Sequence, residues 1–259
     1  MEIYRELDDL YSRLGVLKNT LHSDCRFSNL CWNGVDEKRK SYGEIAQLYR
    51  PYIGARYTES RILALGINMN EYGGYNAEIE LADMASNDIK NGKKKTFAKD
   101  GYKGSLVWHR ILSYATFILR EISLFEIPEL RPYPEKEELS KAIDFIAVTN
   151  SIKCCPWEER SKPTNEMWKH CPNFILKEEM GVLKPKHIIV LGVDNFSSLL
   201  SLFFNKVELV DGNTRIIKAR FDDCDINIYS FPHPSSSQGT SMSRMDELER
   251  LLMNSNFRT

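Results

Sequence analysis

Short apolar runs and longer helical patterns alternate along most of this chain. The runs are apolar and partly β-branched, as buried strands are. They cover residues 62–65, 145–149, 187–191 and 226–231. Apolar residues recur at helical spacing in the stretches between or beside these runs, which are 106–122, 135–142, 164–181 and 195–204. The pattern therefore predicts an α/β chain in which strands and helices are mixed.

Three further segments have patterns of their own. An apolar stripe opens the chain and predicts a helix over residues 2–21. The helix that begins near residue 164 has Thr164 as its expected N-cap, and Gly181 and Pro185 are expected to end it. Residues 215–225 indicate a strand or a hairpin, and the pattern leaves its register open.

Length and composition set the bounds of the prediction. With 259 residues and 42% hydrophobic residues, the simplest prediction is one large α/β domain, with two small domains as the alternative. We expect that domain over residues 1–259, with an N-terminal helix and cysteine segment over 1–55 and a core over 60–256. The formal net charge of −1 excludes a global basic field, so any binding of nucleic acid must use a local patch or backbone amides.

Compartment follows from what the sequence lacks. No apolar run is long enough to span a membrane, and Met1-Glu2 opens no signal sequence. The expectation is therefore a cytoplasmic protein. In a reducing compartment its six cysteines are expected to be thiols or metal ligands rather than disulfides.

Polar residues follow the ends of three predicted strands. The sequences are Gly66-Ile67-Asn68, Thr149-Asn150 and Pro232-His233-Pro234-Ser235-Ser236. Each one alone is also typical of an ordinary turn, because asparagine tolerates unusual backbone angles and a histidine after a strand is a common loop residue. Their value lies in their combination and order.

Taken together with the segment between them, these motifs resemble the uracil-DNA glycosylase superfamily, most closely its iron–sulfur branch. The matches to that branch, in order, are Thr149-Asn150, Lys153-Cys154-Cys155-Pro156, Glu166, Cys171 and the run from Pro185 to Gly192. Gly66-Ile67-Asn68 is similar to the first motif of the mismatch-specific and single-strand-selective branches. His233-Pro234-Ser235 resembles the second family motif, His-Pro-Ser. The resemblance covers about residues 25–245, with gaps at 75–100 and 205–225.

The resemblance implies a fold and an activity. The expected fold has three layers, α/β/α, around a central, mainly parallel sheet of four strands. The expected protein is a monofunctional DNA glycosylase that hydrolyses the N-glycosidic bond of a flipped uracil, or another modified base, in DNA. Its partner would be DNA that contains such a base, and we expect it to act as a monomer without contacting a membrane.

Residue roles follow from the same resemblance. Asn68 falls where the family positions its attacking water, and His233 where it places a donor to a base oxygen; these are the expected catalytic residues. The base-binding residues would be Gly66, Ile67, Tyr102 and Asn150, with Tyr102, in Gly101-Tyr102-Lys103-Gly104, stacking on the flipped base. The DNA-binding residues would be Ser235, Ser236, Lys93, Lys94 and Lys95, although a lysine run such as the last three is by default a solvated loop.

Four cysteines match the order of the family's cluster ligands: Cys25, Cys31, Cys154 and Cys171. The resemblance therefore implies a structural [4Fe–4S] cluster, with zinc or no metal as the alternatives. The gap between Cys25 and Cys31 is wider than the family's usual spacing. Cys155 and Cys224 have no family counterpart and are expected to be buried thiols.

Two departures keep other functions open. Met69-Asn70 stands where the related branches have Pro-Gly, and Ile67 stands where the iron–sulfur branch has an acidic residue. A non-catalytic nucleic-acid-binding relative, or a cluster-bearing structural protein of the same fold, is therefore an alternative. A glycosylase for a bulky phage-type modified pyrimidine, acting in defence, is another.

Overall fold

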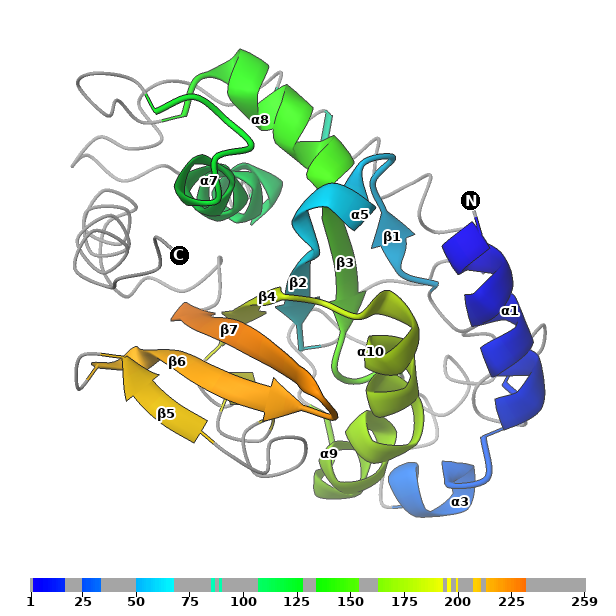
Figure 1. Cartoon of the computed structure of the whole chain (residues 1–259). Coiled ribbons are helices and arrows are strands. Elements are labelled where there is room, and N and C mark those ends of the chain that lie inside the picture. Colours follow the sequence, from blue (N-terminus) through cyan, green and yellow to red (C-terminus); the bar gives the residue numbers. More distant parts are fainter. Residues whose placement is uncertain are drawn as a thin grey trace.

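The computed structural model of this chain describes residues 2–16, 25–33, 50–67, 85–86, 89, 107–127, 134–153, 163–192, 195–196, 199, 207–210 and 213–231. Within these ranges one seven-stranded sheet has the order β1-β3-β2-β4-β7-β6-β5 (Figure 1). Its strands are β1 (Tyr52–Ile53), β2 (Ile62–Gly66), β3 (Ile146–Asn150), β4 (His187–Leu191), β5 (Val207–Val210), β6 (Asn213–Phe221) and β7 (Cys224–Phe231).

The centre of the sheet confirms the expected parallel arrangement. β3, β2, β4 and β7 are adjacent and parallel, and they coincide with the four apolar runs of the sequence. The expectation of only four strands needs a correction, because β1, β6 and β5 extend the sheet by antiparallel pairing. The segment 215–225 proves to be most of β6 and the turn into β7, in a register that pairs Ile217 with Ile228.

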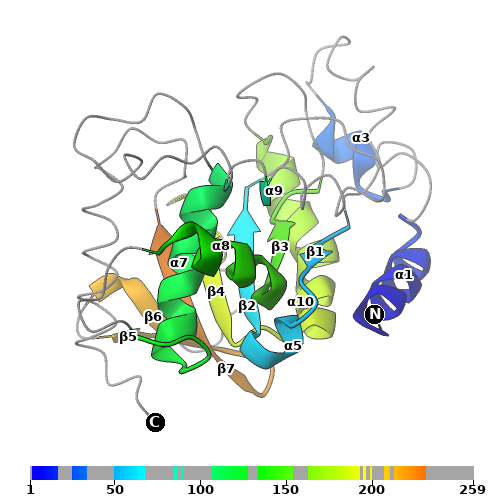
Figure 2. The same cartoon turned by 90° about the horizontal axis from the view of Figure 1, so that it is seen from above.

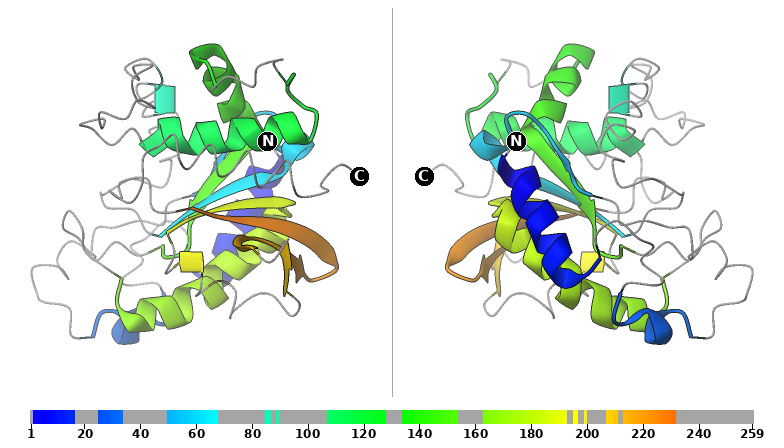
Figure 3. Two further views of the ribbon diagram at one scale, coloured as in Figure 1. Left: turned by 90° about the vertical axis from the view of Figure 1, so that its left-hand side faces the viewer. Right: turned by 90° about the vertical axis from the view of Figure 1, so that its right-hand side faces the viewer.

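Helices cover both faces of the sheet and complete the three expected layers. Figure 3 shows the sheet nearly edge-on, with α7 and α8 on one side and α1, α9 and α10 on the other. The helices are α1 (Glu2–Leu14), α3 (Ser28–Cys31), α5 (Tyr57–Ser60), α7 (Val107–Glu121), α8 (Lys136–Ala142), α9 (Asn165–Cys171) and α10 (Lys177–Leu183). None of the helices in the described ranges combines the length and apolar character that a bilayer span requires.

Two cores result from the alternation of side chains along each strand. In β2, Ile62 and Ala64 pack into the core beneath α7 and α8, whereas Leu63 and Leu65 pack into the core beneath α1, α9 and α10. A central parallel strand that is buried on both faces is mostly apolar, which is why β2 appeared in the sequence as a continuous run rather than as an alternating one.

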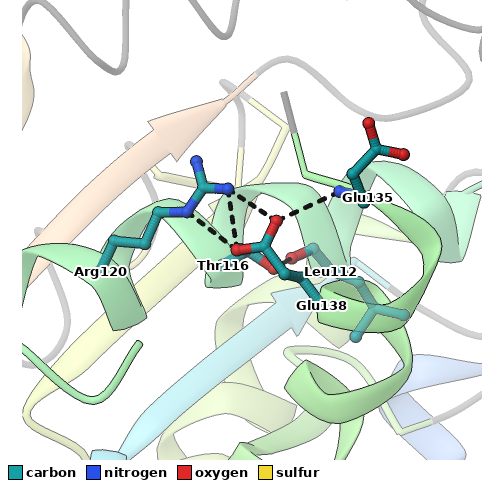
Figure 4. Close-up of polar contacts among 5 residues, drawn as sticks. All are labelled: Leu112, Thr116, Arg120, Glu135 and Glu138. Carbon is teal, nitrogen blue, oxygen red and sulfur yellow. Dashed lines mark hydrogen bonds and ion pairs between the residues drawn. The ribbon is translucent and has the colours of Figure 1, made fainter. Parts of the chain in front are cut away.

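The carboxylate of Glu138 joins α7 and α8 on their side of the sheet. Glu138 on α8 forms an ion pair with Arg120 on α7 at 2.7 Å and also accepts from the backbone N–H of Glu135 at 3.2 Å (Figure 4). Arg120 is almost fully buried, so its charge needs this partner. Close by, the Thr116 hydroxyl donates to the carbonyl of Leu112 within α7 at 2.8 Å.

Two helix ends differ from the sequence prediction. The apolar stripe predicts a helix to residue 21, but α1 ends at Leu14 because Gly15 has a φ of 71°. Gly181 and Pro185 are the expected end of the other helix; it runs through Gly181, and the chain leaves α10 at Lys184, which has a φ of 49°. Pro185 follows and cannot continue the helix.

The start of α9 agrees with the prediction. The Thr164 hydroxyl accepts from the backbone N–H of Met167 at 3.2 Å, as an N-cap does. Between α9 and α10 lies a π-helical segment, Pro172–Leu176, which the sequence pattern did not predict. Because proline has no N–H to donate, Pro172 interrupts the regular hydrogen bonding directly after Cys171.

Candidate active site

Two of the expected site segments meet at one edge of the sheet. The chain passes from β2 to β3 on one side and then to β4 on the other, so the strand order reverses between β2 and β4. In open α/β sheets, ligands bind at such a switch point, outside the carboxyl ends of the strands. Figure 2 shows the parallel strands pointing the same way toward this edge. Gly66 ends β2 and Asn150 ends β3, so both lie there.

Gly66 and Asn150 are in direct contact. They are paired in the β2–β3 register, and a Cβ on Gly66 would lie 2.3 Å from the Oδ1 atom of Asn150. Beyond the strands, the N–H of Ser151 donates to the Gly66 carbonyl at 2.9 Å, and the N–H of Ile152 donates to the Ile67 carbonyl at 2.8 Å. The half-buried Asn150 side chain is thus held against the turn that leads to Asn68.

A buried side chain from beyond β4 joins the same edge. Asn195 is fully buried and donates from Nδ2 to the carbonyl of Gly66 at 3.1 Å. Its Oδ1 atom accepts from the Ser151 hydroxyl at 2.6 Å. Gly192 turns the chain out of β4 with a φ of 107°, a conformation that glycine adopts without strain.

The end of β7 is also fixed at this edge. The Phe231 carbonyl accepts from the N–H of Gly192 at 2.7 Å, and the Phe231 ring stacks on Tyr114 of α7 with centroids 4.0 Å apart. His233 follows two residues later in the sequence. The strand that leads to it is therefore attached both to β4 and to α7.

Several predicted residues lie outside the described part of the chain. They are Asn68, Tyr102, His233, Ser235, Ser236, Lys93, Lys94, Lys95 and Cys154. Of the predicted base-binding set, the structure brings Gly66, Ile67 and Asn150 together. The first motif has the apolar Ile67 where the iron–sulfur branch has an acidic residue. The Ile67 side chain packs toward Gly192, and its Cδ1 atom would lie 3.2 Å from a Cβ built on that glycine.

Three of the four predicted cluster ligands share one buried region. Cys25, Cys31 and Cys171 are buried thiols in the same core cluster, and the Thr164 hydroxyl links α9 to the Cys31 carbonyl at 3.0 Å. Burial raises the pKa of Cys31 to about 11, and the nearby Cys25 adds to the rise. Burial raises the pKa of Cys171 to about 12, with Cys25 and Cys31 adding to it and Lys153 opposing it.

These thiols fit a metal or cluster better than they fit nucleophilic chemistry. A buried thiol with a raised pKa is inert as a nucleophile at neutral pH, whereas a bound cation favours the thiolate form. Among the described residues alone, no three histidine, cysteine or acidic side chains form a group that could hold a metal ion. Cys154, the fourth expected ligand, lies outside the described residues, which therefore include only three of the four expected cysteine ligands.

A buried charge network supports the segment between Asn150 and Cys154. The Lys153 ammonium lies 2.5 Å from the Glu179 carboxylate and 2.5 Å from the Thr149 hydroxyl. The Tyr11 hydroxyl of α1 donates to Glu179 at 2.6 Å, and the backbone N–H of Lys153 donates to the Cys171 sulfur at 3.1 Å. The network therefore connects α1, β3, α10 and the thiols.

Sequence patterns missed the residues of these supporting contacts. Asn195 and Glu179 are polar residues in helical stretches and Ser151 directly follows a strand, and for all three an exposed position is the ordinary expectation. Lys153 alone had a signal, since it belongs to the Lys-Cys pair of the family resemblance. Their burial depends on contacts across 26 to 168 positions of the chain, which no local pattern contains.

Comparisons with known proteins bear on this arrangement. The model of the uracil DNA glycosylase superfamily matches residues 100–253, a range that includes Asn150 and the motif at His233 and begins after Gly66. A type-4 uracil-DNA glycosylase from Pyrobaculum aerophilum is 27% identical over 92 residues, which is 35% of this chain. The matched part spans 46% of the length of that relative.

Proposed function

This chain belongs to the uracil DNA glycosylase superfamily, and we propose that it is a monofunctional DNA glycosylase. Its reaction would be hydrolysis of the bond between deoxyribose and a flipped uracil or another modified base. The observation that carries the proposal is the contact of Gly66 with Asn150 at the switch point of the sheet. There a base-reading amide lies beside the turn that leads to Asn68.

The chemistry explains why these residue types suit the site. Breaking an N-glycosidic bond leaves positive charge on the sugar and negative charge on the departing base, so both need stabilisation in the transition state. Asn68 orients the attacking water at the sugar, and His233 donates to a base oxygen. The Asn150 amide carries both a donor and acceptors, which match the edge of a pyrimidine. Tyr102 stacks on the base once it has left the duplex.

DNA contacts are assigned to groups outside the catalytic pair. Ser235 and Ser236 donate to phosphate oxygens near the flipped nucleotide, and Lys93, Lys94 and Lys95 supply an electrostatic contact. A net charge of −1 supports local contacts of this kind over a general attraction to DNA. The uracil in the name of the Pyrobaculum relative makes uracil the first base to test.

A cofactor belongs to the same proposal. Cys25, Cys31, Cys154 and Cys171 would hold a [4Fe–4S] cluster, with zinc as the alternative. When bound, the cluster supplies a structural cross-link and no step of hydrolysis. The burial of three of the thiols in one region, and the bond from the Lys153 N–H to the Cys171 sulfur, support this assignment.

A panel of modified DNAs tests the activity. The protein is incubated with oligonucleotides that contain uracil, other deaminated bases or bulky modified pyrimidines, and any free base is identified by mass. Asn68→Ala and His233→Ala are each expected to lower the single-turnover rate of base release by ~10²–10³. DNA binding should persist in both, because phosphate contacts supply most of the affinity. Base release by Asn68→Ala at the wild-type rate would move the search to Asn70, Glu71 or the 75–100 segment.

Asn68→Asp is the sharper probe of the same assignment. A carboxylate at this position favours the cationic sugar and polarises the water, so activity on uracil should persist or rise. A loss as large as that of Asn68→Ala would contradict the assigned role.

One observation favours a second candidate, a non-catalytic DNA-binding relative. Ile67 is apolar where the iron–sulfur branch carries an acidic residue, and it packs toward Gly192. DNA binding without release of any base across the panel would select this function over the glycosylase.

A further inference from the structure

The side-chain amide of Asn195 occupies the point where the sheet opens. The β2–β3 ladder continues to the pair Gly66 and Asn150, but the β2–β4 ladder stops one residue earlier, at Leu65 and Val190. On the β4 side, Asn195 takes over from the strand: its Nδ2 atom lies 3.1 Å from the Gly66 carbonyl and 3.4 Å from the Leu65 carbonyl. A side chain thus replaces backbone pairing at the switch point.

Both ends of this amide are used, and they join the two motif segments. Oδ1 accepts from the Ser151 hydroxyl at 2.6 Å, while the N–H of Ser151 donates to the same Gly66 carbonyl at 2.9 Å. Gly66, Ser151 and Asn195 therefore form a closed set of hydrogen bonds. An amide supplies a donor and an acceptor from one rigid plane, whereas a hydroxyl, a carboxylate or an apolar group in its place would break the set.

Local geometry places Asn195 there with little freedom. The Phe196 N–H donates to the Gly192 carbonyl at 3.1 Å, as in a helical turn, and this bond holds Asn195 close to the end of β4. Asn195 has no exposed surface. A Cβ built on Gly192 would lie 3.9 Å from the Cβ atom of Asn195. A buried amide whose bonds are all made is rigid, because leaving any partner unpaired has a high free-energy cost.

We propose that Asn195 is a positioning residue that fixes the spacing between Asn150 and the end of β2 at Gly66 and Ile67, which leads to Asn68. The inference rests on the proposed glycosylase function, in which Asn68 acts at the sugar and Asn150 reads the attached base. These two groups serve one nucleotide, so their separation decides whether water and base are aligned together. A displacement of about 1 Å in such a site can lower a rate by as much as 10²-fold.

Three variants and a control test the inference. Asn195→Ala removes the bonds of the side chain to both Ser151 and Gly66. Asn195→Asp keeps the acceptor for the Ser151 hydroxyl and loses the donor to the Gly66 carbonyl. Ser151→Ala removes the hydroxyl bond to Asn195 and keeps the bond from Asn195 to Gly66. Thr116→Val is the matched control, since it removes a buried hydroxyl whose bond stays within α7 (Figure 4). The measurements are single-turnover base release, DNA affinity, melting temperature and hydrogen exchange at the amides of Ser151 and Ile152.

The expected result is a split between rate and binding. Asn195→Ala and Asn195→Asp should lower the single-turnover rate roughly 10- to 10²-fold at temperatures where each variant is fully folded, with DNA affinity close to that of Thr116→Val. Their melting temperatures should fall, because each leaves buried hydrogen-bonding partners unpaired. Ser151→Ala should lower the rate less and should add nothing to Asn195→Ala, because both remove the same link. Exchange at Ser151 and Ile152 should rise in Asn195→Ala and stay unchanged in the control.

Failure of the inference differs from failure of the proposed function. If Asn195→Ala changes rate and exchange no more than Thr116→Val does, Asn195 is not a positioning residue. If the wild-type protein releases no base from any DNA, the glycosylase proposal fails, and exchange at Ser151 and Ile152 still decides whether Asn195 holds the two segments together.

Discussion

Gly66 has no room for a side chain in the candidate site. The Oδ1 atom of Asn150 occupies the position next to its missing Cβ, at a distance of 2.3 Å from where that atom would be. Glycine is used where another group must approach the backbone this closely. The identity of residue 66 therefore sets the position of Asn150.

Gly66→Ala is expected to displace Asn150 and to lower base release at least tenfold in single-turnover assays, since misplacement by about 1 Å can have that effect. Gly181→Ala is the control, because a Cβ there meets nothing within 4 Å. Gly181 lies within α10, and alanine has a higher helix propensity than glycine. The control should melt slightly higher and keep full activity. Equal activity of the two variants would show that the side chain of Asn150 is not needed in its present place.

His187 predicts how stability depends on acid. Burial lowers its pKa to about 4, with the charge of Lys186 adding to the effect, and its Nδ1 atom lies 3.2 Å from the Tyr229 hydroxyl. An unfolded chain has the ordinary pKa of about 6.5 at this residue and binds a proton first as the pH falls. Stability from this group is therefore complete above about pH 6.5 and is lost between there and pH 4.

At about 1.4 kcal/mol per pKa unit, the loss at His187 reaches roughly 3 kcal/mol. His187→Gln, which stays neutral, should flatten the fall of the unfolding free energy between pH 7 and pH 4 in urea titrations. An unchanged slope in the variant would contradict the pKa shift. His109, whose pKa burial also lowers to about 4, should retain its own contribution in that variant.

At the scale of elements, a buried ion pair joins parts of the chain that are far apart. Lys153 follows β3 and Glu179 lies in α10, and their side chains are 1% and 0% exposed. Tyr11 brings α1 to the same carboxylate, next to α10 as Figure 1 shows. Removing one charge from such a pair leaves the other buried and unpaired.

Glu179→Gln is expected to lower the free energy of unfolding by about 3–5 kcal/mol, because the Lys153 ammonium loses its counter-charge. Adding Lys153→Met should recover much of the loss, since the double variant buries no charge. Glu59→Gln, in the exposed pair with Arg56, is the control and should change stability little. Urea denaturation measures all three, and equal effects at residues 59 and 179 would contradict the role of burial.

At the scale of the whole molecule, the thiols connect the N-terminal segment to the sheet. Cys25 and Cys31 come from the segment that holds α3, and Cys171 ends α9 on the α10 side of the sheet. A cluster held there would tie residues that are more than a hundred positions apart. Its loss should therefore affect folding as well as colour, because ligation is coupled to folding.

Anaerobically purified protein is expected to be brown, with about four iron atoms per chain. Cys154→Ser and Cys171→Ser should lose the colour, the iron and much of the thermal stability. Cys224→Ser is the control, because Cys224 is exposed at the start of β7, contrary to the expectation of a buried thiol, and should keep all three. Zinc near one atom per chain, with no iron, would replace the cluster by a zinc site.

Local sequence predicted the parts of the fold that local physics controls. β2, β3 and β4 were visible as apolar runs because central strands buried on both faces are mostly apolar. β7 was visible from its β-branched and aromatic residues, although Asn227 and Ser230 interrupt its apolar pattern. The Thr164 cap was visible because a hydroxyl at that position satisfies a free N–H of the first turn. The stop before Pro185 was visible too, because proline cannot continue a helix. The left-handed backbone of Lys184 was not, because lysine has no preference for that conformation.

Sequence by itself determined the order of the motifs, the strands that deliver them and the family resemblance. Only the tertiary structure decided that Gly66 has no space for a Cβ, that Asn195 closes the open end of the sheet, and that Lys153 and Glu179 are buried together. The reason is that periodicity reports which face of one element meets the core. Which partner a polar side chain finds there depends on how distant elements pack, and no single segment carries that information.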